Sequence, residues 1–151
     1  MVTLSQNVGR HLYGSGDKMM FDAGIHRVSE IQMNAIVRAC EQAGWRIFRL
    51  PPNIIDKRTF FYGIAQTFPL DPPLERYEKW EALSDSLWSG LDELDEDRIV
   101  VIWPDAFRMA TSDPRAFDIA QSIFAELVRS LGDPEITVGT TKTIVIFEGE
   151  A

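Results

Sequence analysis

Four carboxylates and a tryptophan are spaced so that they could bind a cation together. Glu78, Glu81, Asp85 and Asp92 follow one another at intervals of three, four and seven residues, and at about 100° per residue they share roughly 60° of a helix surface. Trp88 lies beside Glu81 and Asp85 on the same construction, and an aromatic ring among charges is typical of an interface centre. The pattern indicates a surface for a positively charged partner. An acidic face that meets only solvent is the alternative.

These carboxylates do not complete a catalytic or metal site. Glu81 and Asp85 could act as general acid and base, but the only histidines, His11 and His26, stand far away in the sequence and no nucleophile motif is present. The acidic run at 92–97 lacks the glycine and the ligand spacing of a calcium loop, and a single cysteine argues against zinc. We therefore expect no enzymatic activity, no metal and no cofactor.

The charge balance narrows the class of partner. The 151 residues contain 15 Lys and Arg and 23 Asp and Glu, which gives a net charge of −8. Ten acids and two bases lie between Asp71 and Asp97, so this segment alone carries the excess. Nucleic acids and anionic membranes bind clustered basic residues, so we expect neither as a direct partner. A basic protein is the expected partner.

The sequence also favours a cytoplasmic protein. Its first residues lack the apolar core of a signal peptide, and no stretch has the length of apolar residues that crosses a bilayer. Cys40 is the only cysteine, so no intramolecular disulfide can form, and its apolar neighbours predict a buried, inert thiol.

Helices and strands alternate around the acidic segment. Capping residues and apolar spacing predict helices at Ser29–Gly44, Asp56–Phe68, about Glu78–Leu94 and Asp113–Gly132. Apolar runs predict strands at Trp45–Leu50, Arg98–Trp103 and Thr143–Phe147, with Ile136–Val138 as a candidate short strand beside the last. Residues 1–27 show no clean period and are expected to form a loosely ordered arm. The order predicts an α/β domain with a small, mostly parallel sheet of three strands.

The acidic segment resembles a known family. Phe68-Pro69 and the run YEKWEALSDSL at 77–87 are similar to barstar-like proteins, in which Phe-Pro and a short aromatic and glycine loop precede Asn-Trp-Asp-Ala-Leu-x-Asp-x-Leu. The agreement extends over residues 39–147. It implies a barstar-like domain at 39–151, preceded at 1–38 by an N-terminal arm and the start of an extra helix.

The resemblance also implies a function, that of an immunity protein which protects a bacterium from its own ribonuclease toxin. In this family an aspartate of the acidic helix enters the nuclease active site at a phosphate position, and Asp85 matches that aspartate. Glu81 and Glu126 match two further acidic positions of the family. The other residues expected at this surface are Tyr77, Glu78, Ser84 and Trp88.

Two departures from the family pattern fall at the start of the acidic helix. Tyr77 stands in place of a glycine and Lys79 in place of an asparagine. We expect a monomer that forms a 1:1 complex. The alternative is an acidic regulatory protein whose basic partner is not a nuclease.

Overall fold

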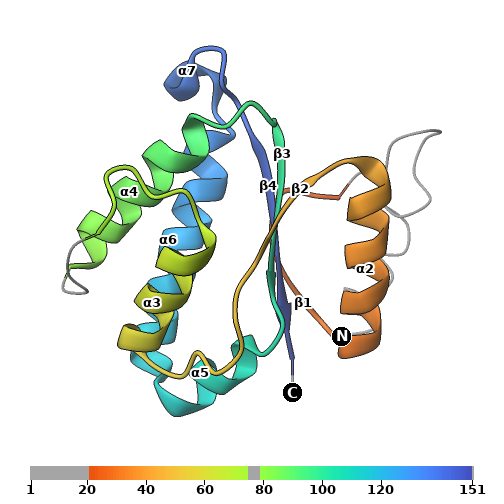
Figure 1. Cartoon of the computed structure of the whole chain (residues 1–151), viewed down its shortest axis with the longest axis vertical. Helices are drawn as coiled ribbons and strands as arrows, with labels where there is room; N and C mark the ends of the chain where they lie inside the picture. The colour runs from red at the N-terminus through yellow and green to blue at the C-terminus, as the bar shows by residue number, and fades with distance from the viewer. Residues whose placement is uncertain (1–20, 75–78, 151) are drawn as a thin grey trace.

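A parallel sheet forms the centre of the computed structural model, which describes residues 21–74 and 79–150 (Figure 1). Within these residues the sheet has four strands, β1 (Gly24–Val28), β2 (Arg46–Arg49), β3 (Arg98–Trp103) and β4 (Thr143–Gly149), in the order β1-β4-β3-β2. Every neighbouring pair of strands is parallel. The last strand in the sequence, β4, therefore lies inside the sheet, between β1 and β3.

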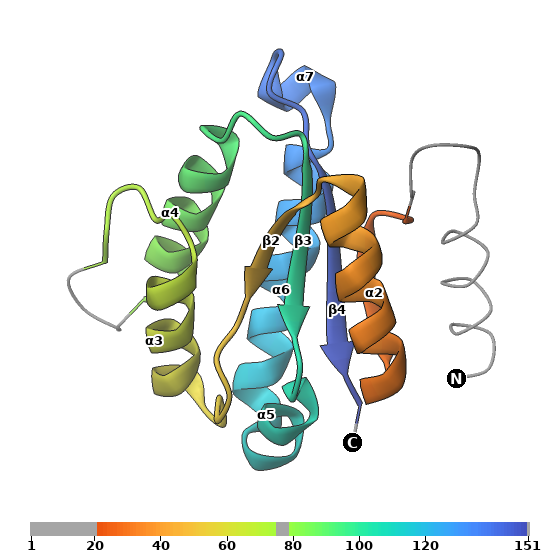
Figure 2. The ribbon, with the colours of Figure 1, turned by 45° about the vertical axis from the view of Figure 1, so that its right-hand side comes forward.

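Helices cover both faces of the sheet. One face carries α2 (Glu30–Ala43), and the other carries α3 (Lys57–Thr67), α4 (Trp80–Asp92), α5 (Ala106–Ser112) and α6 (Pro114–Leu131), as Figures 1 and 2 show. A single turn, α7 (Pro134–Thr137), connects α6 to the approach to β4. Among the described helices, none is long and apolar enough to cross a membrane.

Successive residues of the inner strands point to opposite faces and build two apolar cores. One core lies between the sheet and α2, where Met33, Ile36 and Cys40 of the helix meet the strand residues Val100, Ile102, Val145 and Phe147. Ile99, Val101, Trp103, Ile144 and Ile146 belong to the larger core beneath α3, α4 and α6. Cys40 is buried as expected, and burial, with a smaller contribution from the nearby Glu41 charge, raises the pKa of its thiol to about 12. A raised pKa disfavours the reactive thiolate.

The helix ends follow the predicted caps. Ser29 and Gln32 form a reciprocal capping box at the start of α2, and Gly44 ends that helix with a φ of 79°. Asp56 accepts a hydrogen bond from the Thr59 N–H at the start of α3, and Asp113 accepts one from Ala116 at the start of α6.

Three expectations need correction. The sheet has four strands rather than three, because residues 24–27 of the predicted arm, together with Val28, form β1 along the outer side of β4. Ile136–Val138 does not form a strand: Asp133 caps the turn α7, and Pro134 occupies its first position. The acidic helix is shorter than predicted and spans Trp80–Asp92. The expected domain boundary at 38/39 falls inside α2, and residues 1–20 of the expected arm lie outside the described part of the chain.

Candidate partner-binding site

The loop before α4 packs on the middle and the C-terminal part of the acidic helix. Phe68 is buried and its ring stacks on Phe48, with 4.8 Å between the ring centroids. The Asp71 N–H donates a hydrogen bond of 3.1 Å to the carbonyl of Ser86. Gly90 permits this close approach, because a Cβ atom at position 90 would lie 1.4 Å from the carbonyl oxygen of Pro69. The loop and the helix therefore form one packed unit.

The apolar side of α4 is buried as predicted. Leu83, Leu87 and Leu91 have at most 1% of their surface exposed and belong to the larger core. The Trp80 ring, at the first helical position, lies against the Phe60 and Phe61 rings at centroid distances of 6.0 and 5.0 Å. This packing decides which side of α4 faces outward.

The C-terminal end of α4 is held by the segment that leads into β4. Asp92 accepts a hydrogen bond of 2.5 Å from the Thr140 hydroxyl. The ammonium group of Lys142, a buried residue, donates hydrogen bonds to the carbonyl oxygens of Leu94 and Glu96. A cation at this position also interacts favourably with the helix dipole. Asp92 is thus a structural acid, whereas the earlier acids of the helix are not held in this way.

Glu81 and Asp85 are exposed on the outer side of α4, one turn apart. Within residues 21–74 and 79–150, neither carboxylate takes part in an ion pair. Ser84 lies between them and is half-buried. Two negative charges on a fixed helix are therefore free to accept hydrogen bonds from a cationic group. Tyr77 and Glu78, which complete the predicted surface, lie outside the described residues.

Trp88 is turned toward α6 more than the sequence suggested. Its ring is half-buried against the larger core, and its indole N–H donates a hydrogen bond of 2.9 Å to the Ser130 hydroxyl. The Ser130 hydroxyl in turn donates to the carbonyl of Glu126 at 2.8 Å. The indole N–H is already used within the protein, so the ring surface is what remains for a partner.

The backbone of Glu126 is connected to α4 by this same link. The helices α4 and α6 run side by side in the same direction (Figure 1). Glu126 lies one turn before Ser130 on α6, and Asp85 lies about one turn before Trp88 on α4. Glu126 is exposed and forms two hydrogen bonds with Arg129, at 3.1 and 2.5 Å. These bonds lower the pKa of Glu126 below its ordinary value. Among the described residues, Glu126 is therefore a paired acid, whereas Glu81 and Asp85 take part in no ion pair.

Ser130 and Arg129 were missed by the sequence reasoning. The spacing of Glu126 and Arg129 by three residues could have signalled their pairing. Nothing in the sequence indicates that Ser130 meets Trp88, because the two residues are far apart along the chain. No group of three or more potential metal-binding side chains occurs in the described part of the protein.

Comparison with known proteins gives one match. The family model named Barstar, described as barnase inhibitor, matches residues 47–141. This segment runs from β2 to the loop after α7 and contains all of α3, α4, β3, α5 and α6. Searches of curated proteins and of solved structures found no match.

Proposed function

Because the chain belongs to the barstar (barnase inhibitor) family, whose model matches more than half of it, we propose that it is an immunity protein that blocks the active site of a bacterial ribonuclease toxin. In this proposal α4 supplies the blocking surface and its carboxylates occupy the positions of substrate phosphates. The expected inhibitor is a cytoplasmic monomer that binds its nuclease 1:1, has no enzymatic activity and needs no cofactor.

The observation that carries this proposal is that Glu81 and Asp85 are exposed, and in no ion pair with any described residue, on a helix that is packed at both ends. A ribonuclease holds phosphate with arginine, lysine and histidine side chains, and carboxylate oxygens accept the same charge-assisted hydrogen bonds. Because α4 is already packed against its loop, its core and Lys142, the acids lose little freedom when they bind.

The neighbouring residues extend the proposed surface. Glu126 contributes a third acid, and Arg129 beside it can be released or can itself meet an acidic group of the nuclease. Ser84 and the ring of Trp88 provide contact area around Asp85. Tyr77 and Glu78, just before α4, are proposed to contact the partner as well.

Inhibition of RNA cleavage tests the function directly. The purified chain is titrated into barnase, the enzyme in the family description, and into the nuclease encoded by the adjacent gene, while cleavage of a fluorescent RNA is followed. We expect cleavage by at least one enzyme to stop at one equivalent of inhibitor. Full activity of both enzymes with excess protein would overturn the proposal. Recovery from cells of a basic partner without nuclease activity would instead support the regulatory alternative.

A further inference from the structure

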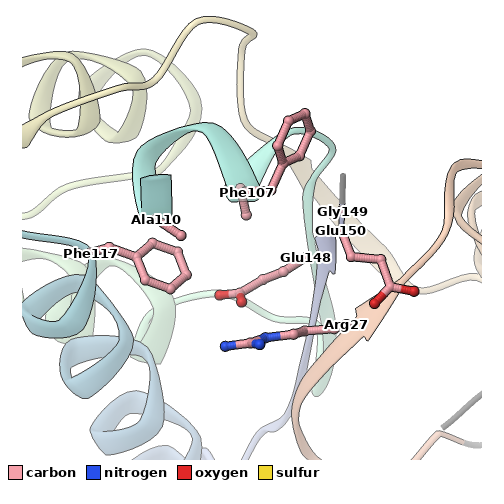
Figure 3. A pocket seen from close by; sticks show the side chains of 8 residues that line it. Arg27, Phe107, Ala110, Phe117, Glu148, Gly149 and Glu150 are labelled. Carbon is pink, nitrogen blue, oxygen red and sulfur yellow. The ribbon is translucent and has the colours of Figure 1, made fainter. Parts of the chain in front are cut away.

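A pocket of about 130 Å³ lies at the carboxyl end of the sheet, away from α4 (Figure 3). The chain leaves β1 toward α2 on one face and leaves β3 toward α5 on the other, and β4 ends between them. In parallel sheets such a divergence of connections opens the crevice in which ligands bind. The pocket is lined by Arg27 of β1, by Phe107 of α5 and by Phe117 of α6. Glu148 of β4 and Glu150, just after this strand, complete the lining.

Glu148 is the unusual group in this pocket. Its side chain is 1% exposed, although it stands on the central strand between Arg27 and Trp103 in the register. Its Oε1 atom accepts a hydrogen bond of 2.9 Å from the Gln121 amide. Its Oε2 atom is buried and has no hydrogen-bond partner among the described residues. A buried carboxylate oxygen without a donor is strongly unfavourable.

Glu148 and its neighbour each have a buried oxygen that lacks a hydrogen-bond donor in the described structure. Gln121, which donates to Glu148, has its own Oε1 atom buried and without a partner in the described structure. Two hydrogen-bonded side chains therefore each leave one acceptor oxygen unused. Native proteins satisfy nearly all such groups with protein, water or ligand. Of these two residues, only Glu148 lines the pocket, so an N–H donor of a ligand there would serve Glu148.

The charged groups around the pocket also suit a cationic ligand. Figure 3 shows Arg27 and Glu148 extending side by side toward Phe117, yet the two form no ion pair in the described structure. Glu150 adds a second carboxylate at the edge of the pocket. The nearby Arg108 is directed elsewhere, because its guanidinium bonds to Asn53 Oδ1 at 2.7 Å. When Glu148 is ionised, two acids stand against one base, and the pocket then carries an excess of negative charge.

From this geometry we propose that the pocket binds a small organic ammonium group, whose N–H donors satisfy Glu148 while its alkyl carbons pack on Phe107 and Phe117. A cavity of roughly 150 Å³ admits a molecule of the size of benzene, so a pocket of about 130 Å³ accepts a short alkyl chain. Phenyl faces also attract cations directly. The group is either a free amine or a lysine side chain, which share this chemistry.

Two further observations support the site. Burial raises the pKa of Glu148 to about 7, against the opposing effects of the Gln121 hydrogen bond and the Arg27 charge, so a bound cation would compete with a proton for this carboxylate. Arg27 and Glu148 lie outside residues 47–141, the segment that matches the family, whereas Phe107 and Phe117 lie inside it. The pocket shares no residue with the partner-binding surface proposed for α4.

Titration with amines tests the proposal on the full chain. Butylammonium, the amide of Nα-acetyl-lysine and neutral butan-1-ol are added separately, and binding is followed by calorimetry and by the ¹³C shift of the Glu148 carboxyl. We expect saturable 1:1 binding of at least one amine, weak or absent binding of the alcohol, and a lower pKa of Glu148 in the complex. Preference for butylammonium identifies a free amine as the ligand, and preference for the lysine derivative identifies a protein side chain.

Variants decide whether Glu148 is responsible. Glu148→Gln keeps the shape of the side chain and should weaken amine binding by about tenfold or more. Ala110→Leu fills the pocket without changing its charge and should also abolish binding. Glu41→Gln, an exposed acid on α2, is the matched control and should bind as the wild type does. Failure of both amines to bind, equal binding of butan-1-ol, or unchanged affinity in both pocket variants would overturn the proposal.

Discussion

At the scale of single residues, four acids of this protein occupy three environments. Within the described residues, Glu81 and Asp85 are exposed and take part in no ion pair, Glu126 is exposed but bonded to Arg129, and Glu148 is buried. In the first environment the carboxylate can accept hydrogen bonds from a partner directly. In the second it can do so only after its bonds to Arg129 break, and in the third its protonation depends on pH. Each environment leads to a different kind of test.

The exposed acids make an unequal contribution to binding in the proposed complex. We predict that Asp85→Ala weakens binding of the nuclease by at least about 2 kcal/mol, or roughly 30-fold, because a central charged contact is lost. Asp95→Ala, beyond the end of α4, is the matched control and should change affinity little. Isothermal titration calorimetry with the nuclease measures both. Equal losses for the two variants would contradict the assignment of Asp85 to the centre of the interface.

The buried acid makes stability depend on pH. Burial raises the pKa of Glu148 from the ordinary value of 4.5 to about 7 in the folded protein. Below about pH 4.5 the group is protonated whether the chain is folded or not, and its favourable contribution is fully present. As pH rises through 7 the folded protein must bury a charge, so this contribution is lost. The shift corresponds to about 3 kcal/mol at most.

Glu148→Gln isolates that effect. The variant keeps an acceptor for Gln121 but cannot ionise, so its free energy of unfolding relative to the wild type should rise between pH 4.5 and pH 8, by up to about 3 kcal/mol. Urea denaturation at several pH values measures the difference. Glu150→Gln, at the same pocket, is the matched control. A constant difference between Glu148→Gln and the wild type over this range would show that Glu148 does not titrate as described.

At the scale of secondary-structure elements, α4 depends on its contacts at both ends. The close approach at Gly90 predicts that Gly90→Ala lowers the free energy of unfolding by about 1–3 kcal/mol, although alanine ordinarily favours a helix over glycine by about 1 kcal/mol. The reason is the Pro69 carbonyl, which a Cβ atom would meet at 1.4 Å. Urea denaturation measures the change, with the adjacent Ser89→Ala as control. A Gly90→Ala protein as stable as the wild type would show that the loop at 68–71 does not pack on α4 as described.

The elements that could be predicted from the sequence are those with local signals. The starts of α2, α3 and α6 are predicted by their capping residues Ser29, Asp56 and Asp113. The nearly continuous apolar run at 98–103 predicts β3 as a strand that is buried on both faces. β1 has no such signal, because it is a short edge strand whose first four residues are not fully buried. Its formation depends on β4, whose residues come near the other end of the sequence.

The candidate site could be predicted in outline only. The outward direction of Glu81 and Asp85 followed from helical periodicity, since the leucines opposite them had to be buried. The direction of the Trp88 indole did not follow, because its partner Ser130 belongs to another helix. Glu148 was missed for a similar reason: a single acid after an apolar run gives no sign that helices will cover the end of the strand.

At the scale of the whole molecule, the negative charge is less evenly available than the sequence suggests. Beyond the C-terminal end of α4, Lys142 contacts the backbone carbonyls of Leu94 and Glu96, and Arg46 lies 3.5 Å from the Glu96 carboxylate. At the start of α4, Lys79 is the N-cap residue and the Lys57 ammonium lies 5.6 Å from the centroid of the Trp80 ring. Glu81 and Asp85 nevertheless take part in no ion pair in the described structure, so their charges remain available to a cationic partner.

This distribution predicts that salt slows association with a basic nuclease. Between about 50 and about 500 mM NaCl the association rate constant should fall by about tenfold, while the dissociation rate changes much less. Stopped-flow fluorescence measures both rates. The double variant Asp95→Asn/Asp97→Asn, which removes charge away from the contact, should reduce the salt dependence without speeding dissociation. An association rate that does not respond to salt would exclude long-range attraction.

The central place of β4 also sets the order in which a newly made chain can fold. Gly24 pairs with Val145, and Ile99 pairs with Ile144. The sheet therefore cannot form completely until nearly all of the described residues have left the ribosome. Contacts between such distant parts of a chain form slowly. A nascent copy therefore completes its sheet only late in its own synthesis. In the proposed immunity function, the inhibitor must then be completed before the toxin becomes active.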